Sequence, residues 1–448
     1  MKKVISFIFD ADSMAGRIIC CILYILFYDY MFENFVYKLF SYMGGVDYVE
    51  MTFLKRLSWI VISVIPIIAY QKIEDASSFI CLFLYLFVYL PFVHALFTLY
   101  GISNLSLYAY TGILCCLFFL YFCIGRFGTP LKNLDFSPSI PLVYIEIATL
   151  LLTIIFIAFR ANSMHFVNIF TQLDVLYSLR EENSENSSGI GLILYIQGWL
   201  SGAFYPFLLV CYLNQKSWLK TIGILCGYIL LFMADMQKIT FLLPFALIGM
   251  YYLIKLKEEI ICMRLHSYIV LGVSLISIIL FIIQDENNKV LFTLISIVLL
   301  RTVCVAGWLT QNYYHFFQEN PYTYYTHINI VNALTGGYPY DRPLGQAVAY
   351  GAQNANANMF LTDGMAAAGL VGIIFIGCIF LVVLYFINAI SYKYKKTDLF
   401  VIFLPSLAYL LNVSLFTTLL SSGLLILFVI LLCFDTSSLN IRSINNNK

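Results

Sequence analysis

Long apolar runs separated by short polar breaks follow one another along almost the whole chain. A helix that crosses a membrane needs about 20 predominantly apolar residues, or somewhat fewer where a loop dips inward. Thirteen stretches approach that length, near 18–37, 57–71, 79–100, 105–124, 141–159, 190–213, 219–234, 239–254, 267–284, 290–309, 365–390, 399–413 and 417–434. The pattern predicts an all-α, polytopic membrane protein.

The positions of lysine and arginine predict the orientation of these helices, because basic loops stay on the cytoplasmic side. The basic loops as far as Arg264 all fall inside if each run up to that point crosses. Lys393, Lys395 and Lys396 require the inside too, yet three further crossings would put them outside. We therefore expect the run at 290–309, which follows a polar break, to be a partial or re-entrant element. That leaves a transmembrane bundle of about 12 spanning helices with both termini inside.

Two long polar intervals fall on the outer side of this topology and form large loops, at 160–189 and 310–364. In the first loop, apolar residues from Phe166 to Tyr177 recur at helical spacing, which predicts an amphipathic helix on the membrane surface. The second loop lies in the longest interval without a membrane-length apolar run. Loops supported by a rigid scaffold commonly carry function, so we expect the active site there, within a single membrane domain over 1–448.

The composition supports the membrane class and narrows the function. Of the 448 residues, 61% are hydrophobic and 11% are charged, whereas soluble domains have about 25% charged residues. The net charge of +1 gives no reason to expect nucleic-acid binding. The 12 cysteines form no CxxC pair, and the chain has no Walker loop, no HExxH motif and no acidic DxD pair in the long loop. We therefore expect neither a metal nor a cofactor.

Arginine outnumbers lysine among the basic residues that this topology places outside. Four lysines stand against five arginines, which are Arg56, Arg160, Arg180, Arg301 and Arg342. The planar guanidinium binds phosphate through two hydrogen bonds, whereas the lysine ammonium is a compact point charge. The bias favours a phosphorylated ligand, although arginines that reach lipid headgroups or cap loops would give the same count.

The long outer loop contains a predicted helix and a turn-rich aromatic segment. Residues 311–319 have helical spacing, with Tyr313 on an aromatic side and with His315 and Glu319 one turn apart on another. Glycine and proline turns then bracket Tyr338, Tyr340, Asp341 and Arg342. An aromatic face covers the C–H side of a sugar ring and a phenol bonds its hydroxyls. The tyrosines suit a membrane interface equally well.

Two further features stand out in the apolar runs. Glu146 is the clearest acid inside such a run, and an ionisable residue at membrane depth is by default a functional hypothesis. Gly364, Ala368 and Gly372 recur every four residues, a spacing that lets a membrane helix approach its neighbour closely.

Two segments of the chain carry a resemblance to a known family. They are Arg301-Thr302 with Gly307 and Tyr313-Tyr314-x-Phe316-Phe317, and Asn354-Ala355-Asn356-Ala357-Asn358-x-Phe360-x-x-Asp363-Gly364 followed by Gly369 and Gly372. In these segments and in its hydropathy the chain resembles the O-antigen polymerase (Wzy) family of Gram-negative bacteria. The resemblance implies a GT-C-like architecture in the inner membrane, with the active site facing the periplasm. The implied activity is polymerisation of undecaprenyl-pyrophosphate-linked oligosaccharide repeats, with membrane lipid, a flippase and a chain-length regulator as partners.

The resemblance also nominates residues for the two halves of this chemistry. Periplasmic arginines would bind the pyrophosphate, and the candidates are Arg160, Arg180, Arg301 and Arg342. The glycan would contact Tyr313, Tyr338, Tyr340 and Asn356. The transfer needs its leaving group stabilised as charge develops, and it needs a base for the proton of the acceptor hydroxyl. The base candidates are His315 oriented by Glu319 and, as their rival, Asp341.

Two other functions share part of this pattern. An O-antigen ligase would use the same lipid-linked donor and the same arginines, and it differs in its acceptor. A lipid-linked oligosaccharide flippase would need polar residues around a cavity near the membrane midplane, whereas most charges here lie in loops and at helix ends.

Overall fold

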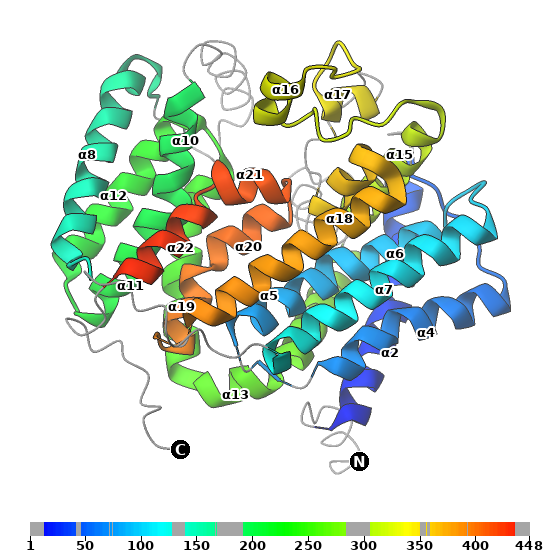
Figure 1. Cartoon of the computed structure of the whole chain (residues 1–448). Helices are drawn as coiled ribbons and strands as arrows, with labels where there is room; N and C mark the ends of the chain where they lie inside the picture. The colour runs from blue at the N-terminus through cyan, green and yellow to red at the C-terminus, as the bar shows by residue number, and fades with distance from the viewer. Residues whose placement is uncertain are drawn as a thin grey trace. The chain divides into compact units, whose positions relative to one another are not determined.

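The computed structural model describes residues 13–41, 46–70, 72–73, 75–127, 139–165, 167, 191–283, 305–349, 355, 359–391 and 393–434. Within these residues the regular structure is helical, apart from an isolated β-type bridge between Ile140 and Phe434 (Figure 1). The all-α prediction is confirmed for this part of the chain. The amphipathic helix expected in 160–189 and the doubtful run at 290–309 lie largely outside the described residues, so both stay predictions.

Eight helices in the described ranges are long and apolar enough to cross a membrane. They are Met14–Tyr37, Ala76–Phe97, Asn104–Ile124, Leu142–Ser163, Gly191–Asn214, Trp218–Asp235, Lys238–Glu258 and Phe360–Ser391. Shorter apolar helices cover Arg264–Ile279 and Leu424–Cys433. The arrangement is consistent with a helical membrane protein, while the expected number of about 12 crossings and the GT-C-like architecture stay predictions.

The chain divides into two compact units. Unit 1 contains Met1–Gly128, Glu259–Tyr385 and Leu410–Leu415. Its helices include α2 (Met14–Met31), η1 (Phe32–Tyr37), α3 (Lys38–Phe40), α4 (Phe53–Ala69), α5 (Ala76–Leu84), η3 (Tyr85–Tyr89), α6 (Leu90–Phe97), α7 (Asn104–Phe127), α15 (Val305–Glu319), α16 (Asn329–Thr335), α17 (Leu344–Val348) and most of α18 (Phe360–Ser391). Helices α5, η3 and α6 form one continuous helix, Ala76–Phe97, which is almost fully buried because α4, α7 and α15 pack against it. Helix α15 includes the helix expected over 311–319 and begins earlier.

A proline inside α4 explains two of the tyrosines buried in unit 1. Pro66 has no N–H, so the carbonyl of Ile62, four residues earlier, has no donor within the helix. The Tyr89 hydroxyl donates to Ile62 O at 2.7 Å, and the Tyr85 hydroxyl donates to the next carbonyl, Ser63 O, at 2.6 Å. The hydroxyls of Tyr85 and Tyr89 therefore satisfy carbonyls of α4 where water is not available to do so.

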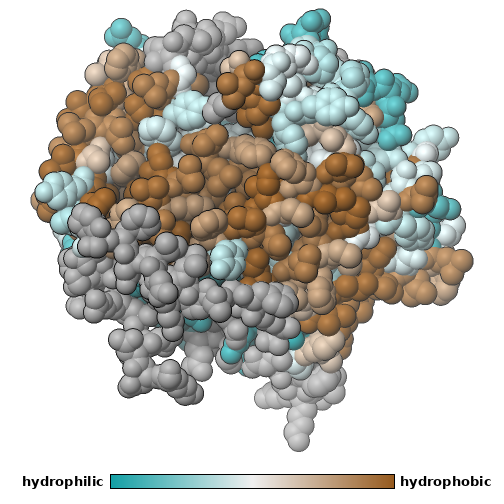
Figure 2. Space-filling view, viewed as in Figure 1, coloured by the Kyte–Doolittle hydropathy of each residue, from teal (hydrophilic) through white to brown (hydrophobic). Residues whose placement is uncertain are grey.

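Unit 2 contains Thr129–Glu258, Phe386–Tyr409 and Phe416–Lys448. Its helices include α8 (Leu142–Arg160), η4 (Ala161–Ser163), α10 (Gly191–Trp199), η5 (Leu200–Phe204), α11 (Tyr205–Asn214), α12 (Trp218–Asp235), the first part of α13 (Lys238–Ile282), α19 (Lys396–Ile402), most of α20 (Leu404–Leu410) and α21 (Leu415–Leu420), and α22 (Leu424–Cys433). Helix α8 exposes apolar side chains such as Val143, Ile147 and Leu150, and Figure 2 shows apolar surface over it. A contiguous exposed apolar face of this kind is typical of contact with lipid.

Two glycines let the segment between α21 and α22 approach the backbone of α10 and η5 closely. A Cβ on Gly198 would lie 1.9 Å from Ser421 O, and a Cβ on Gly202 would lie 1.9 Å from Ser422 O. The two glycines are four residues apart, so they lie on one face of the helix.

The sequence expected such a close approach for Gly364, Ala368 and Gly372 on one helix face. There α18 is non-helical at Ala368 and Gly369, and Gly364 and Gly372 approach each other: a Cβ on Gly372 would lie 1.9 Å from Gly364 O.

We predict that Gly198→Ala destabilises the protein by about 1–3 kcal/mol, because the added methyl group overpacks a backbone contact. The thermal unfolding midpoint of the detergent-solubilised protein measures the effect. Gly223→Ala is the matched control, because Gly223 is an exposed helical glycine with nothing within 4 Å of an added Cβ. Equal midpoints for the two variants would show that the close approach of Ser421 is not required.

Candidate active site

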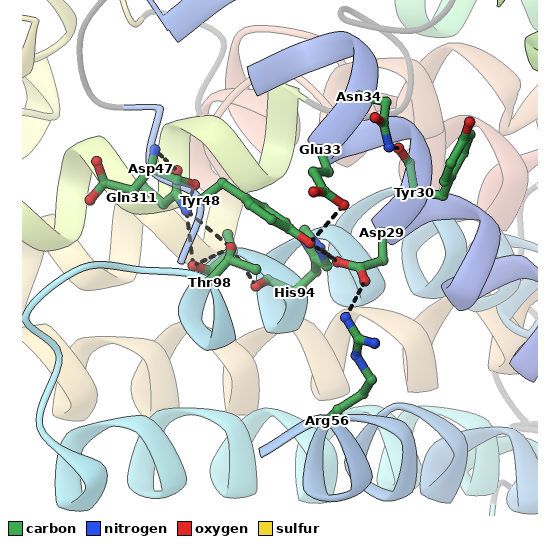
Figure 3. Close-up of polar contacts among 11 residues, drawn as sticks. Asp29, Tyr30, Glu33, Asn34, Asp47, Tyr48, Arg56, His94, Thr98 and Gln311 are labelled. Carbon is green, nitrogen blue, oxygen red and sulfur yellow. Dashed lines mark hydrogen bonds and ion pairs between the residues drawn. The ribbon is translucent and has the colours of Figure 1, made fainter. Parts of the chain in front are cut away.

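A short non-helical segment, Val46–Glu50, lies against the ends of α6 and α15 in unit 1 (Figure 3). Its backbone is fixed at two points. The Val49 N–H donates to Thr98 O at 2.9 Å, and the Asp47 N–H donates to Gln311 Oε1 at 3.0 Å. Thr98 directly follows α6, where the last carbonyls have no helical donor. The segment therefore satisfies the open end of α6 while it presents its own side chains.

Gln311 is the residue that holds this region together. Its side chain is fully buried, and its amide group donates to Asp47 O and to Ala95 O, both at 3.0 Å, while its oxygen accepts from the Asp47 N–H. One amide thus joins α15, the last turn of α6 and the segment Val46–Glu50. A buried polar group with all its hydrogen bonds made fixes a unique geometry. The sequence predicted a helix at Gln311 and gave no sign of this role.

His315 lies one turn after Gln311 and forms a pair with Asp47. His315 Nε2 is 2.8 Å from Asp47 Oδ2, and the two side chains are 40% and 29% exposed. The hydrogen bond from His315 holds the pKa of Asp47 below its usual range, so the carboxylate is ionised at neutral pH and accepts. The proton of the neutral ring is then on Nε2, which leaves Nδ1 with a free lone pair. His315 is therefore positioned to take a proton.

The carboxylate at His315 differs from the one that the sequence suggested. Glu319 was expected to orient His315, but it is exposed, and in the described part of the chain the carboxylate bonded to His315 is Asp47. A pair one turn apart on a helix surface gains only a few tenths of a kcal/mol. Gln311 already holds Asp47 in place, so His315 pairs with this distant residue and not with Glu319 on its own helix.

A second group of polar side chains lies on the other side of the same segment (Figure 3). Asp29 Oδ1 is 2.8 Å from His94 Nε2, and Arg56 Nη2 is 3.6 Å from Asp29 Oδ2. The Tyr48 hydroxyl lies 3.3 Å from Asp29 and 3.4 Å from Glu33. Burial raises the pKa of Tyr48, so this phenol keeps its proton and donates it to one carboxylate at a time.

The Asp29–His94 pair is enclosed by aromatic rings. The His94 ring is fully buried, and its centre lies 4.9 Å from those of Tyr28 and Phe32 and 5.6 Å from that of Trp59. A buried carboxylate needs charged or hydrogen-bonding partners, and Asp29 has His94, Arg56 and Tyr48. The sequence did contain a signal for it, since Asp29 stands within an apolar run, as Glu146 does.

The predicted aromatic segment forms a half-exposed platform beside α15. The rings of Tyr338 and Tyr340 are 5.6 Å apart, and that of Tyr340 is 5.3 Å from Phe316. The Tyr338 hydroxyl donates to Arg342 O at 2.8 Å, and the Tyr340 hydroxyl donates to Pro321 O. Burial raises the pKa of Tyr340 to about 12. Both phenols are therefore neutral and are held in place by the backbone, so their ring faces, and not their hydroxyls, are available to a ligand.

Three other nominated residues of unit 1 can be placed. Asp341 and Arg342 are exposed. Tyr313 is fully buried, with its ring 6.2 Å from that of Phe317. A fully buried ring presents no face to a sugar, so the structure does not support Tyr313 as a glycan contact. Its place on the aromatic side of the helix reflects packing in the core.

Unit 2 contains a buried arginine with a carboxylate, that of Asp235, nearby. Arg160 ends α8 and is 7% exposed, and within the described ranges its guanidinium has no ion pair and its Nε has no hydrogen-bond partner. The nearby carboxylate of Asp235 instead accepts from Gln197 at 2.7 Å and from Thr240 at 2.6 Å. A buried charge is costly unless it is paired. Arg160 therefore has the properties of an anion-binding residue.

The remaining candidates are quickly placed. Arg180, Arg301 and Asn356 lie outside the described residues. Glu146 accepts from Lys220 at 2.7 Å and from Tyr212 at 2.9 Å, which makes it one half of an ion pair in unit 2. Among the residues that the structure describes, no three His, Cys, Asp or Glu side chains come together as metal ligands would.

Comparison of the chain with protein-family models, with curated proteins and with solved structures finds no match. The chemistry of the site therefore rests on its geometry.

We predict that diethyl pyrocarbonate, which acylates a free imidazole nitrogen, modifies His315 much faster than His94. The His315 side chain is 40% exposed, whereas the His94 ring is fully buried. Mass spectrometry of the full chain in detergent measures both rates, and exposed His165 provides a positive control. Equal rates at His94 and His315 would contradict the described burial and the assigned free nitrogen.

Proposed function

We propose that the chain is a glycosyltransferase, an O-antigen polymerase that joins undecaprenyl-pyrophosphate-linked oligosaccharide repeats at the periplasmic face of the inner membrane. The observation that carries the proposal is the His315–Asp47 pair, in which an ionised carboxylate holds an accessible histidine. His315 lies on α15, and the neighbouring Phe316 of the same helix packs against Tyr340 of the aromatic segment. This is the arrangement that a general base acting on a sugar hydroxyl needs.

The proposed reaction uses the pair as follows. The acceptor hydroxyl oxygen attacks the anomeric carbon of the donor sugar and forms the new glycosidic bond. The bond from that carbon to the phosphate oxygen breaks, and undecaprenyl pyrophosphate leaves with the electron pair. His315 Nδ1 takes the proton of the acceptor hydroxyl, and Asp47 stabilises the imidazolium that results, because their contact is short and ionic.

Within unit 2, Arg160 is a separate candidate for binding phosphate. Its guanidinium is buried, and its Nε has no hydrogen-bond partner among the described residues. A phosphate oxygen of the lipid-linked substrate would satisfy it, since arginine binds phosphate through two parallel hydrogen bonds. Loss of a donor aimed at developing charge typically costs about 2.7–4 kcal/mol of transition-state stabilisation.

The aromatic platform fits the saccharide part of the substrate. Tyr338 and Tyr340 are half-exposed, and their hydroxyls are bonded to the backbone. The rings are thus fixed as apolar faces, which pack against the C–H side of a pyranose at little cost in side-chain entropy.

One observation favours a second candidate, a lipid-linked oligosaccharide flippase. Asp29 and His94 form a buried ionisable pair between two helices long enough to cross a membrane, Met14–Tyr37 and Ala76–Phe97. Ionisable residues in such helices mark ion or substrate pathways. An O-antigen ligase remains the third candidate, because it would use the same donor and a similar base.

Deletion of the gene distinguishes these functions through the pattern of surface lipopolysaccharide. A polymerase mutant carries one repeat unit on the core, whereas a ligase or flippase mutant carries none.

Complementation of the deletion strain with variants then tests His315 as the base. His315→Ala and Asp47→Asn should each reduce polymerisation by about 10²-fold or more, while the exposed control His165→Ala restores the full ladder. A parental rate for His315→Ala together with an inactive Asp341→Asn would move the assignment to Asp341.

We predict that Arg160→Lys fails to restore long chains although the protein is present at its normal level. Lysine keeps the charge and loses the planar fork that binds phosphate bidentately. Arg342→Lys is the matched comparison, because Arg342 is exposed and lies in the other unit. A full ladder from Arg160→Lys would show that the buried guanidinium does not act on the leaving group.

A further inference from the structure

Four helices that are long and apolar enough to cross a membrane have one of their ends at the same end of unit 2. In chain order, with a start and a finish alternating there, they are Leu142–Ser163, Gly191–Asn214, Trp218–Asp235 and Lys238–Glu258. Glu146, near the start of α8, joins three of them. It accepts from Tyr212 of α11 at 2.9 Å and from Lys220 of α12 at 2.7 Å. The ends of membrane-crossing helices lie at the level of the lipid headgroups.

A second set of hydrogen bonds joins α13 and α19 to this end. Asn214, the last residue of α11, accepts from the Tyr251 hydroxyl of α13 at 2.9 Å and donates to Asp398 of α19 at 3.0 Å. Tyr251 in turn accepts from Lys255 at 3.0 Å. Asp398 is 3% exposed. The carboxylates of Glu146 and Asp398 are therefore used in contacts between the helix ends.

Lysines gather at the same end, and most of them are exposed. They include Lys216, Lys220, Lys255, Lys257, Lys395 and Lys396. The ammonium groups of Lys220 and Lys255 are held over the rings of Tyr212 and Tyr251, at 5.3 and 5.0 Å from the ring centres. Glu258 is exposed and offsets one of the lysine charges. This end of the unit therefore presents a basic surface.

Large apolar side chains are exposed among these lysines. Trp218 and Leu219, next to Lys220, are 62% and 84% exposed, and Leu256, which has a lysine on either side in the sequence, is 76% exposed. Tryptophan is enriched at the membrane interface. A lysine at that level extends its ammonium toward the headgroups while its apolar stem stays below them. Lysines and exposed apolar side chains together thus match the two parts of a phospholipid.

The turn that carries Lys216 has a backbone conformation that favours glycine. Lys216 has a φ of 56 and directly follows the end of α11. The turn is closed by the Lys216 N–H, which donates to Leu213 O at 3.3 Å, and by the Ser217 N–H, which donates to Tyr212 O at 2.9 Å. Helices commonly end on a glycine in this left-handed conformation, because a side chain there is strained. Lys216→Gly therefore removes the ammonium group without disturbing the turn.

We propose that this end of unit 2 binds the headgroups of anionic phospholipids. The exposed ammonium groups of Lys216 and Lys257 contact lipid phosphate, and Trp218, Leu219 and Leu256 insert among the acyl chains. The sequence predicts this side as the cytoplasmic one, and the cytoplasmic leaflet carries a negative surface potential. A soluble anion fits less well, because it would leave the apolar side chains in water. The surface does not rest on the proposed transferase activity.

Phospholipid binding to the full chain in detergent tests the proposal. Native mass spectrometry compares the retention of dioleoylphosphatidylglycerol with that of dioleoylphosphatidylcholine, whose choline group cancels the phosphate charge. The phosphatidylglycerol should bind more tightly, by about fivefold for each lysine that contacts it. Equal retention of the two lipids would contradict the proposal. Displacement of phosphatidylglycerol by inorganic phosphate would show that the surface binds a free anion, and the lipid assignment would fail.

Two substitutions and a matched control assign the binding to this surface. Lys216→Gly and Lys257→Gln should each reduce the preference for phosphatidylglycerol over phosphatidylcholine by about fivefold. Lys216→Gly should keep or raise the thermal unfolding midpoint in the absence of added lipid, because glycine relieves the left-handed backbone. Lys38→Gln in unit 1 should keep the parental preference, since Lys38 is exposed and donates to Asn34 one turn earlier.

Two outcomes of this series would overturn the proposal. One is a parental lipid preference in the chain that carries both Lys216→Gly and Lys257→Gln. The other is an equal loss of preference in Lys38→Gln, because the preference would then follow the total charge of the protein and not this surface.

Discussion

Every carbonyl that a helix leaves open inside an apolar bundle must find a donor, because no water is available there to provide one. Unit 1 meets this requirement repeatedly with polar groups from neighbouring segments. Tyr89 serves the carbonyl left open by Pro66, Gln311 serves the end of α6, and Thr323 with its neighbour serves the break in α18. These donors are fixed in place by the backbone that they satisfy.

The same requirement places the candidate chemistry. Gln311 is needed to satisfy the end of α6, and through it the segment with Asp47 is held against α15. His315, four residues later on the same helix face, then meets a carboxylate that is already fixed. If His315 is the base proposed above, this fixed orientation reduces the entropy that it loses in the reaction. In this unit, the contacts that satisfy the backbone at the end of α6 also fix the carboxylate that pairs with His315.

The sequence was sufficient for the class of fold and for the helix that carries His315. Apolar runs of membrane length predict helices directly, and the spacing around His315 predicts the helix that carries it. Asp47 could not have been paired with His315, because the contact joins positions 47 and 315 through a loop and no periodicity relates them. Tyr313 shows a second limit of sequence reasoning. It lies in a polar interval, which suggests a contact with the glycan, but its face of the helix packs in the core. Arg160 was nominated by its position, but only the structure shows that it is buried and that its Nε has no hydrogen-bond partner among the described residues.

The segment Val46–Glu50 carries a constraint on length that most loops do not have. Asp47 and Tyr48 are consecutive, yet Asp47 contacts His315. Tyr48 instead reaches Asp29 and Glu33 (Figure 3). Backbone bonds on either side of Tyr48, at Asp47 and at Val49, fix the register. An inserted or deleted residue here would exchange the directions of the two side chains and break both groups at once. Loops usually tolerate changes in length, whereas the two opposed contacts of Asp47 and Tyr48 should make Val46–Glu50 intolerant of an inserted or deleted residue.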